Sequence, residues 1–208
     1  MTEVSSQERD YLPGMGKHYL LPLYEVVHLV SGLAGVHGEM VAAAGLRAGQ
    51  RVLDVGCGTG NLLRTTGKRH RDVELFGVDP DLKMLARAER KLRRAGLRAR
   101  LDKGFAQELA FPDASFDAVF SSLMLHHLDT PSKDEMLAEV RRVLRPGGVL
   151  VLADAVFHDH GTMKDHLLDN VGDAVPKRIA AAGFTTEPTR TRKLRMFGAV
   201  GIEVAKVH

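Results

Sequence analysis

Cysteine is almost absent from the chain. The single cysteine among 208 residues is Cys57, so an intramolecular disulfide and a cysteine-based zinc site are both excluded. The charged N-terminal segment lacks the apolar stretch of a secretory signal, and no later apolar run reaches membrane-spanning length without interruption by His, Gly or charge. These absences predict a cytoplasmic protein without a membrane span. Because 208 residues are few for two ordinary domains, we expect one.

Strong net charge is also lacking. The formal net charge is +3 and the pI is about 9.1, which permits nucleic acid or anionic lipid as a partner without requiring either. Seven basic residues nevertheless fall between Arg87 and Arg100, with Glu89 as the only acid. We interpret this segment as the solvated outer face of a helix, and a patch that faces RNA or lipid is the alternative.

Internal repeats and low-complexity tracts are absent, and from Arg51 onward short apolar runs alternate with helical patterns. Such alternation is typical of an α/β fold with a doubly wound, mostly parallel sheet and helices on both faces. Every expected strand ends in small or polar residues, and ligands of open α/β sheets bind outside the carboxyl ends of the strands. The strands are expected over residues 51–55, 73–78, 98–102, 116–121 and 148–153.

Helix boundaries are marked by capping residues. Asp81 is the expected N-cap of a helix that Gly96 ends. Ser132 and Glu135 form a capping box for a later helix, which should stop at Pro146.

The C-terminal part is expected to hold helices over 162–170 and 173–182, followed by strands over 189–196 and 200–207. Only residues 197–199 separate these two strands, too few for a parallel crossover. The strands should therefore pair as a hairpin, which places an antiparallel last strand in a seven-stranded sheet.

All three tyrosines lie in the mostly helical segment 11–46 that precedes the first strand. Aromatic residues clustered near a terminus can simply pack in the core. Alternatively, this segment forms a lid over the ligand, with Tyr11 and Tyr24 contacting the substrate.

A glycine-rich loop, Asp54-Val-Gly-Cys-Gly-Thr-Gly60, follows the first expected strand and opens a helix. Its glycines allow the backbone to approach a ligand closely. Asp79 ends the next strand, where a carboxylate can accept hydrogen bonds from ribose hydroxyls. The combination indicates a nucleoside-containing ligand, and a purely structural turn is the alternative. A nucleophilic role for Cys57 is not expected, because a small residue between two glycines suits this loop.

Between Arg51 and Asp154 the chain carries, in order, the segments Val52 to Gly60, Gly77-Val-Asp-Pro80, Gly104 to Pro112, Phe116-Asp-Ala-Val119 and Leu144-Arg-Pro-Gly-Gly148. These segments resemble the successive motifs of class I (Rossmann-like) S-adenosylmethionine-dependent methyltransferases. They are similar to the small-molecule branch that includes the ubiquinone/menaquinone C-methyltransferases. The resemblance implies transfer of a methyl group from S-adenosylmethionine to a small-molecule acceptor by in-line displacement, with S-adenosylhomocysteine as product. The expected antiparallel last strand also matches that fold and argues against a nicotinamide dehydrogenase.

The resemblance also implies roles for individual cofactor-binding residues. Many relatives carry an aspartate at the position of Phe105 that accepts a hydrogen bond from the adenine amino group. Phe105 cannot accept one, so stacking or a backbone acceptor has to substitute. The implied positions are Asp54, Gly56, Cys57 and Gly58 at the methionyl part, Asp79 at the ribose, Pro80, Met84, Phe105 and Ala106 around the adenine, and Ser121 near the sulfonium.

Two histidines follow the fourth expected strand. A general base assists methyl transfer to a hydroxyl or a protonated amine, and the resemblance places His126 at an acceptor-facing position. We predict His126 as the catalytic residue and His127 as a substrate contact, and a structural role is the alternative for each. A second cluster is expected to form a wall of the acceptor pocket through His158, rather than to bind a metal. That cluster comprises His158, His160, His166, Asp154 and Asp159.

The expected organisation is one methyltransferase domain with a helical lid over 1–46, a cofactor-binding core over 47–155 and C-terminal helices and a hairpin over 156–208. Ser121-Ser-Leu-Met124 stands where many amino-methylating nucleic-acid enzymes carry an Asn/Asp-Pro-Pro-aromatic element, which disfavours a nucleic-acid base as acceptor. An RNA methyltransferase that uses the basic segment and a non-catalytic cofactor-binding scaffold remain alternatives. We expect a monomer or homodimer.

Overall fold

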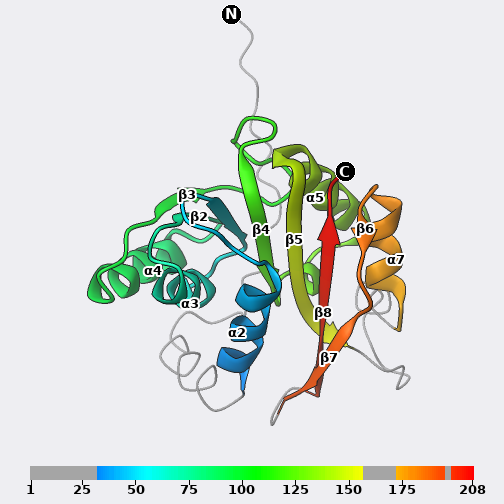
Figure 1. Ribbon diagram of the computed structural model, residues 1–208, viewed down its shortest axis with the longest axis horizontal. Coiled ribbons are helices and arrows are strands. Elements are labelled where there is room, and N and C mark those ends of the chain that lie inside the picture. Colours follow the sequence, from blue (N-terminus) through cyan, green and yellow to red (C-terminus); the bar gives the residue numbers. More distant parts are fainter. Residues whose placement is uncertain (1–31, 157–171, 195–197) are drawn as a thin grey trace, which may run out of the picture.

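The computed structural model describes residues 32–156, 172–194 and 198–208 (Figure 1). In these ranges a sheet of eight strands follows the order β3-β2-β1-β4-β5-β8-β6, and β7 pairs with β8. The strands are β1 (Arg51–Val55), β2 (Glu74–Asp79), β3 (Arg100–Lys103), β4 (Phe116–Ser122), β5 (Leu144–Val156), β6 (Thr185–Thr186), β7 (Arg190–Lys193) and β8 (Ala199–Lys206).

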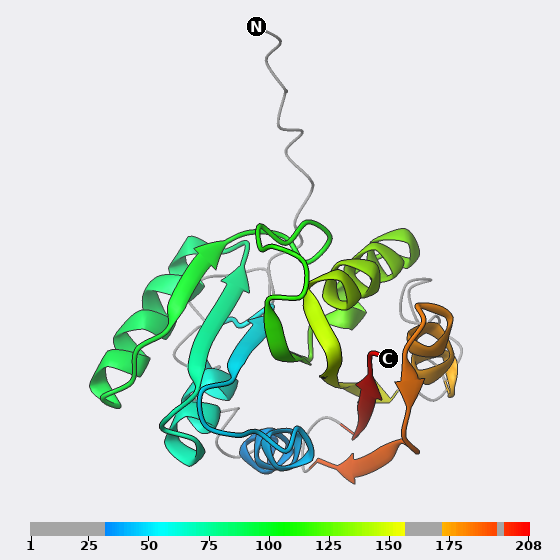
Figure 2. The same cartoon turned by 45° about the horizontal axis from the view of Figure 1, so that its top comes forward.

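Helices cover both faces of this sheet (Figure 2). One face carries α2, α3 and α4, and the other carries α5 and α7, as their membership of two separate buried clusters shows. The doubly wound arrangement predicted from the sequence is therefore confirmed. The helices are α2 (Leu33–Ala43), α3 (Asn61–Arg69), α4 (Leu82–Arg94), the short 3₁₀ helix η2 (Leu125–His127), α5 (Thr130–Val143) and α7 (Ala174–Ala181).

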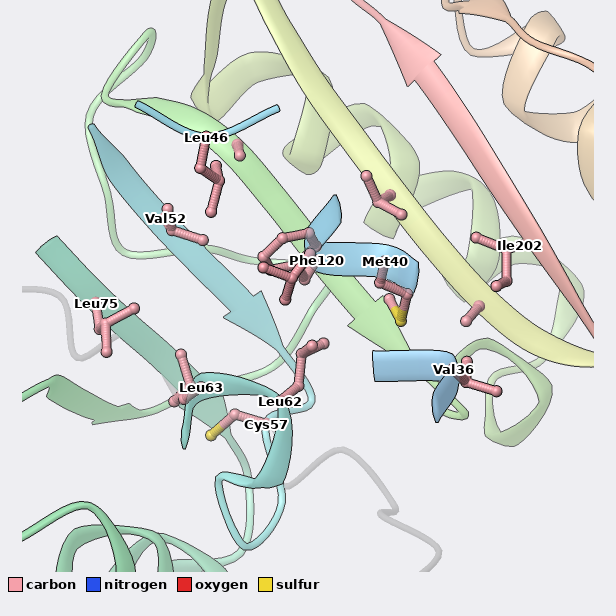
Figure 3. Packing of buried hydrophobic residues seen from close by; sticks show 14 of the residues in the cluster. Val36, Met40, Leu46, Val52, Cys57, Leu62, Leu63, Leu75, Phe120 and Ile202 are labelled. Atoms are coloured by element: carbon pink, nitrogen blue, oxygen red, sulfur yellow. The ribbon is translucent and has the colours of Figure 1, made fainter. Parts of the chain in front are cut away.

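Strand pairing fixes which side chains face which helices. β1 lies between β2 and β4, and all three are parallel, with Asp54 in register with Phe120. Successive side chains of a strand point to opposite faces. Val52 and Phe120 accordingly pack beneath α2 and α3, where Figure 3 shows them with Met40 of α2. Asp54 therefore also points toward the α2 and α3 face.

The last strands of the chain pair antiparallel, as predicted. β8 pairs antiparallel with β5, and β7 pairs antiparallel with β8. The expected strand 189–196 is shorter than predicted, ending at Lys193, and the two-residue β6 precedes it as an additional strand. None of the described helices is both long and apolar enough to cross a membrane.

Capping explains two helix starts, one predicted and one not. Asp81 caps α4 by accepting the backbone N–H of Lys83 at 2.7 Å, as expected. The capping box at Ser132 is wrong, because Asp129 is the N-cap of α5 and its carboxylate accepts the Ser132 N–H at 2.9 Å. An aspartate one turn earlier satisfies the free N–H groups first, so α5 begins at Thr130.

Candidate functional site

A pocket opens at the carboxyl ends of β1 and β4, beneath α2. Strand ends, a glycine loop and the start of a helix contribute its walls, as expected for an open α/β sheet. The residues that line it are Leu33, His37, Asp54, Gly56, Cys57, Gly58, Thr59, Asn61, Leu62, Ser122 and Leu123.

Gly56 and Gly58 of the loop are suited to glycine for different structural reasons. Gly56 and Gly58 both have positive φ angles, 73° and 51°. A Cβ on Gly56 would lie 2.4 Å from Cγ of Met124, so Gly56 provides room for that side chain. A Cβ on Gly58 would meet no atom of the described residues within 4 Å, so among them it would point into open space. Because Gly58 lines the pocket, this open space belongs to the pocket.

Asp79 fastens the loop to the end of β2. One carboxylate oxygen accepts the Gly58 N–H at 2.8 Å, and the other accepts the Asp81 N–H at 2.9 Å. The residue is only 6 % exposed, and burial raises the pKa of its carboxyl group. Each oxygen of a carboxylate has a second lone pair, so Asp79 retains capacity to accept ligand hydroxyls.

Asp54 is the least satisfied charged group of the pocket. It is 2 % exposed, and within the part of the chain that the structure describes its carboxylate accepts no hydrogen bond. Burial raises its pKa well above the ordinary value, and the nearby Asp79 carboxylate raises it further. A buried carboxylate without a partner is costly, and a cation placed beside it would relieve that cost.

Four predicted adenine-side residues lie beyond Asp79, at the ends of β2 and β3. Pro80 follows β2 directly, and Met84 is half-buried in the first turn of α4. Phe105 is half-buried and forms an isolated bridge with Glu108, and the neighbouring Ala106 is buried. The structure gathers these residues on the sheet edge next to Asp79, although they do not line the pocket above.

The two serines at the end of β4 point to opposite faces. Ser121, predicted near the sulfonium, is 1 % exposed on the α5 side, and its Oγ has no hydrogen-bond partner among the described residues. Ser122 lines the pocket, with its Oγ 3.1 Å from Nε2 of His37. Sequence reasoning missed His37 and Ser122, although the alternation of β4 could have separated the two serines.

His126 is held by a carboxylate on the neighbouring strand. Its backbone N–H donates to one oxygen of Asp154 at 2.8 Å, and its Nδ1 lies 2.5 Å from the other. Asp154 is buried near the end of β5. The exposed His127 ring lies 4.1 Å from the His126 ring, centre to centre. Tyr11, Tyr24 and His158 lie outside the described residues.

Comparisons with known proteins show which family the chain belongs to. A protein-family model described as "Methyltransferase domain" matches residues 52–148. A second family model, of the anamorsin N-terminal region, matches residues 106–205. A demethylmenaquinone methyltransferase of Deinococcus radiodurans is 32 % identical over 200 residues, which cover 88 % of this chain and 81 % of the relative. The chain belongs to the class I methyltransferases.

Other relatives match a smaller part of the chain. An uncharacterised methyltransferase of Geobacillus kaustophilus is 39 % identical over 113 residues, which cover 54 % of this chain and 50 % of the relative. The chain spans half or less of the length of this and other curated relatives. A crystal structure of an S-adenosylmethionine-dependent methyltransferase from Aquifex aeolicus shares the fold, with TM-score 0.69, 22 % identity and coverage of 89 % of this chain and 96 % of the other.

Proposed function

We propose that this methyltransferase binds S-adenosylmethionine at the glycine loop and transfers its methyl group to a small-molecule acceptor. The observation that carries the proposal is Asp54, a buried carboxylate without a hydrogen bond among the described residues, in a pocket partly walled by glycines. S-adenosylmethionine carries an ammonium and a sulfonium. Either cation would stabilise the ionised Asp54 and lower its pKa.

The rest of the site fits the nucleoside part of this cofactor. The open space beside Gly58 admits a ligand close to the backbone, and Asp79 has lone pairs left for two ribose hydroxyls. We assign the adenine to the edge formed by Pro80, Met84 and the segment Phe105–Ala106. Since Phe105 lacks a carboxylate, the adenine would be held there by stacking or by backbone groups.

The sulfonium of the bound cofactor supplies an activated methyl group, so the chain mainly has to align the acceptor and exclude water. We assign to His126 the removal of a proton from an acceptor hydroxyl or amine. Asp154 lies at Nδ1 of His126, where its charge would stabilise the imidazolium that forms and its hydrogen bond would orient the ring. Tyr11, Tyr24, His127 and His158 are the proposed remaining contacts of the acceptor. The name of the demethylmenaquinone relative favours a lipophilic acceptor.

Calorimetric titration with S-adenosylhomocysteine tests the cofactor assignment directly. We expect Asp79→Asn to weaken binding at least about tenfold, because hydrogen bonds from ribose hydroxyls to a charged acceptor are lost. Asp113→Asn is the matched control, since Asp113 is exposed and pairs with Arg142 away from the pocket. Thermal unfolding should show that both variants fold. The absence of measurable affinity of the wild type for either form of the cofactor would refute the proposal.

A labelled-donor screen tests the transfer itself. Wild-type protein and S-adenosylmethionine labelled in the methyl group would be incubated with a panel of hydroxyl, amine and quinol acceptors and, separately, with RNA. We expect label in a small molecule and none in RNA, and lower turnover by His126→Ala with unchanged cofactor affinity. Transfer to RNA alone would contradict the proposed acceptor class.

A further inference from the structure

The pocket beneath α2 contains a second polar group besides Asp54. His37 comes from α2 and is 5 % exposed, and its Nε2 lies 3.1 Å from the hydroxyl of Ser122 at the end of β4. Both residues line the pocket that Asp54 also lines. Asp54 is in register with Phe120, and Ser122 follows two residues later on the same face of the sheet. An acidic group and an imidazole–hydroxyl pair therefore border one small space.

The two groups differ in what they recognise. A carboxylate such as Asp54 accepts hydrogen bonds and favours a cation. When the Nε2–H of an imidazole donates to a serine oxygen, the serine hydroxyl proton is directed to another acceptor. The His37–Ser122 pair therefore suits an anion. A ligand that carries an ammonium and a carboxylate on one carbon can place the ammonium at Asp54 and the carboxylate at the His37–Ser122 pair.

We propose that the His37–Ser122 pair binds the carboxylate of the methionine part of S-adenosylmethionine, while its ammonium faces Asp54. This assignment rests on the proposed function, because it presupposes that this cofactor enters the pocket. It gives α2, which precedes the first strand, a direct part in cofactor selection. In this arrangement the Ser122 hydroxyl donates to the ligand carboxylate, and His37 orients that hydroxyl.

Decarboxylated S-adenosylmethionine tests the assignment, because it keeps the ammonium and the sulfonium and lacks only the carboxylate. The measurement is the ratio of the dissociation constants of the two ligands, taken by calorimetry. We expect the wild type to prefer S-adenosylmethionine about tenfold or more, as for a hydrogen bond to a charged group. Ser122→Ala should bring the ratio close to one by weakening only the carboxylated ligand. His37→Ala, which removes the group that orients the Ser122 hydroxyl, should lower the ratio as well.

Two further variants separate this role from general damage. Ser115→Ala removes a buried hydroxyl at the opposite end of β4, where it donates to the Pro112 carbonyl at 2.8 Å, and should leave the ratio unchanged. Asp54→Asn should weaken both ligands by a similar factor, since both carry the ammonium. The assignment is overturned if Ser122→Ala weakens both ligands equally or leaves the ratio at its wild-type value. If the wild type binds neither ligand, the proposed function itself fails, and the assignment fails with it.

Discussion

The substitution Gly58→Ala should have two separable effects, a loss of stability from backbone strain and a loss of cofactor affinity from the space that the new methyl group occupies. Gly58 has a φ of 51°, in the left-handed region, and an added Cβ would meet no atom within 4 Å in the part of the chain that the structure describes. The folding cost is therefore strain alone, about 1–2 kcal/mol. For a chain of this length such a cost lowers the melting temperature by about 2–8 °C. In the cofactor-free protein nothing else should change.

The effect on binding has a different origin. Gly58 lines the pocket, so its new methyl group would occupy space that the cofactor needs. Displacing a ligand by one methyl group in a fitted site costs about 1–3 kcal/mol, which corresponds to about 5- to 150-fold in the dissociation constant. Calorimetry with S-adenosylhomocysteine measures this loss, and differential scanning measures the strain.

Gly147→Ala is the matched control. Gly147 also has a positive φ, 75°, and an added Cβ there would likewise meet none of the described residues within 4 Å. It lies near the start of β5, at the edge of the sheet remote from the pocket. Both variants should lose similar stability, and only Gly58→Ala should lose affinity. Equal affinities of the two variants would refute the argument that Gly58 makes room for the cofactor.

Two further substitutions test charge and packing. Burial raises the pKa of Asp54, so the folded state binds more protons than the unfolded state and stability falls as pH rises above the ordinary aspartate pKa. Asp54→Asn should therefore raise the melting temperature of the cofactor-free protein at pH 7 and flatten its decline from pH 4 to 7; a lower melting temperature would contradict this. Phe116 is fully buried, with its ring 5.1 Å from Phe76 and 4.9 Å from Phe111. Phe116→Ala should lower the free energy of unfolding, measured with denaturant, by about 3–5 kcal/mol. Leu82→Ala, at an exposed position, should lower it by less than about 0.5 kcal/mol. Similar losses in the two variants would show that the cluster of phenylalanine rings contributes little to stability.

Local signals explain what the sequence could predict. Each central strand is a short apolar run that ends in a polar or small residue, and these features depend only on neighbouring positions. Asp79 was therefore identifiable as the end of β2, and Asp81 as the N-cap of α4. The cap of α5 was mistaken because Asp129 and Ser132 lie within one turn, and both residue types are good caps. β6 has two residues, too few to show a period.

Long-range contacts explain what was missed. His37 and Ser122 are separated by 85 positions, and nothing near either residue marks them as partners. Asp154 is 28 positions from His126, so its hydrogen bonds to that residue depend on the parallel pairing of β4 and β5. Residue type and spacing pointed to a site at this edge of the sheet. Only the fold determines which side chains meet there.

The place of β8 has a consequence for synthesis of the chain. β8 lies between β5 and β6, yet it is the last of these strands to be translated. Until it emerges from the ribosome, the backbone groups of β5 that it later pairs with have no strand beside them on that side. An open edge of this kind can pair with another nascent chain. We therefore expect a chain truncated before Ala199 to aggregate more and to need chaperones more than the released chain that carries β8.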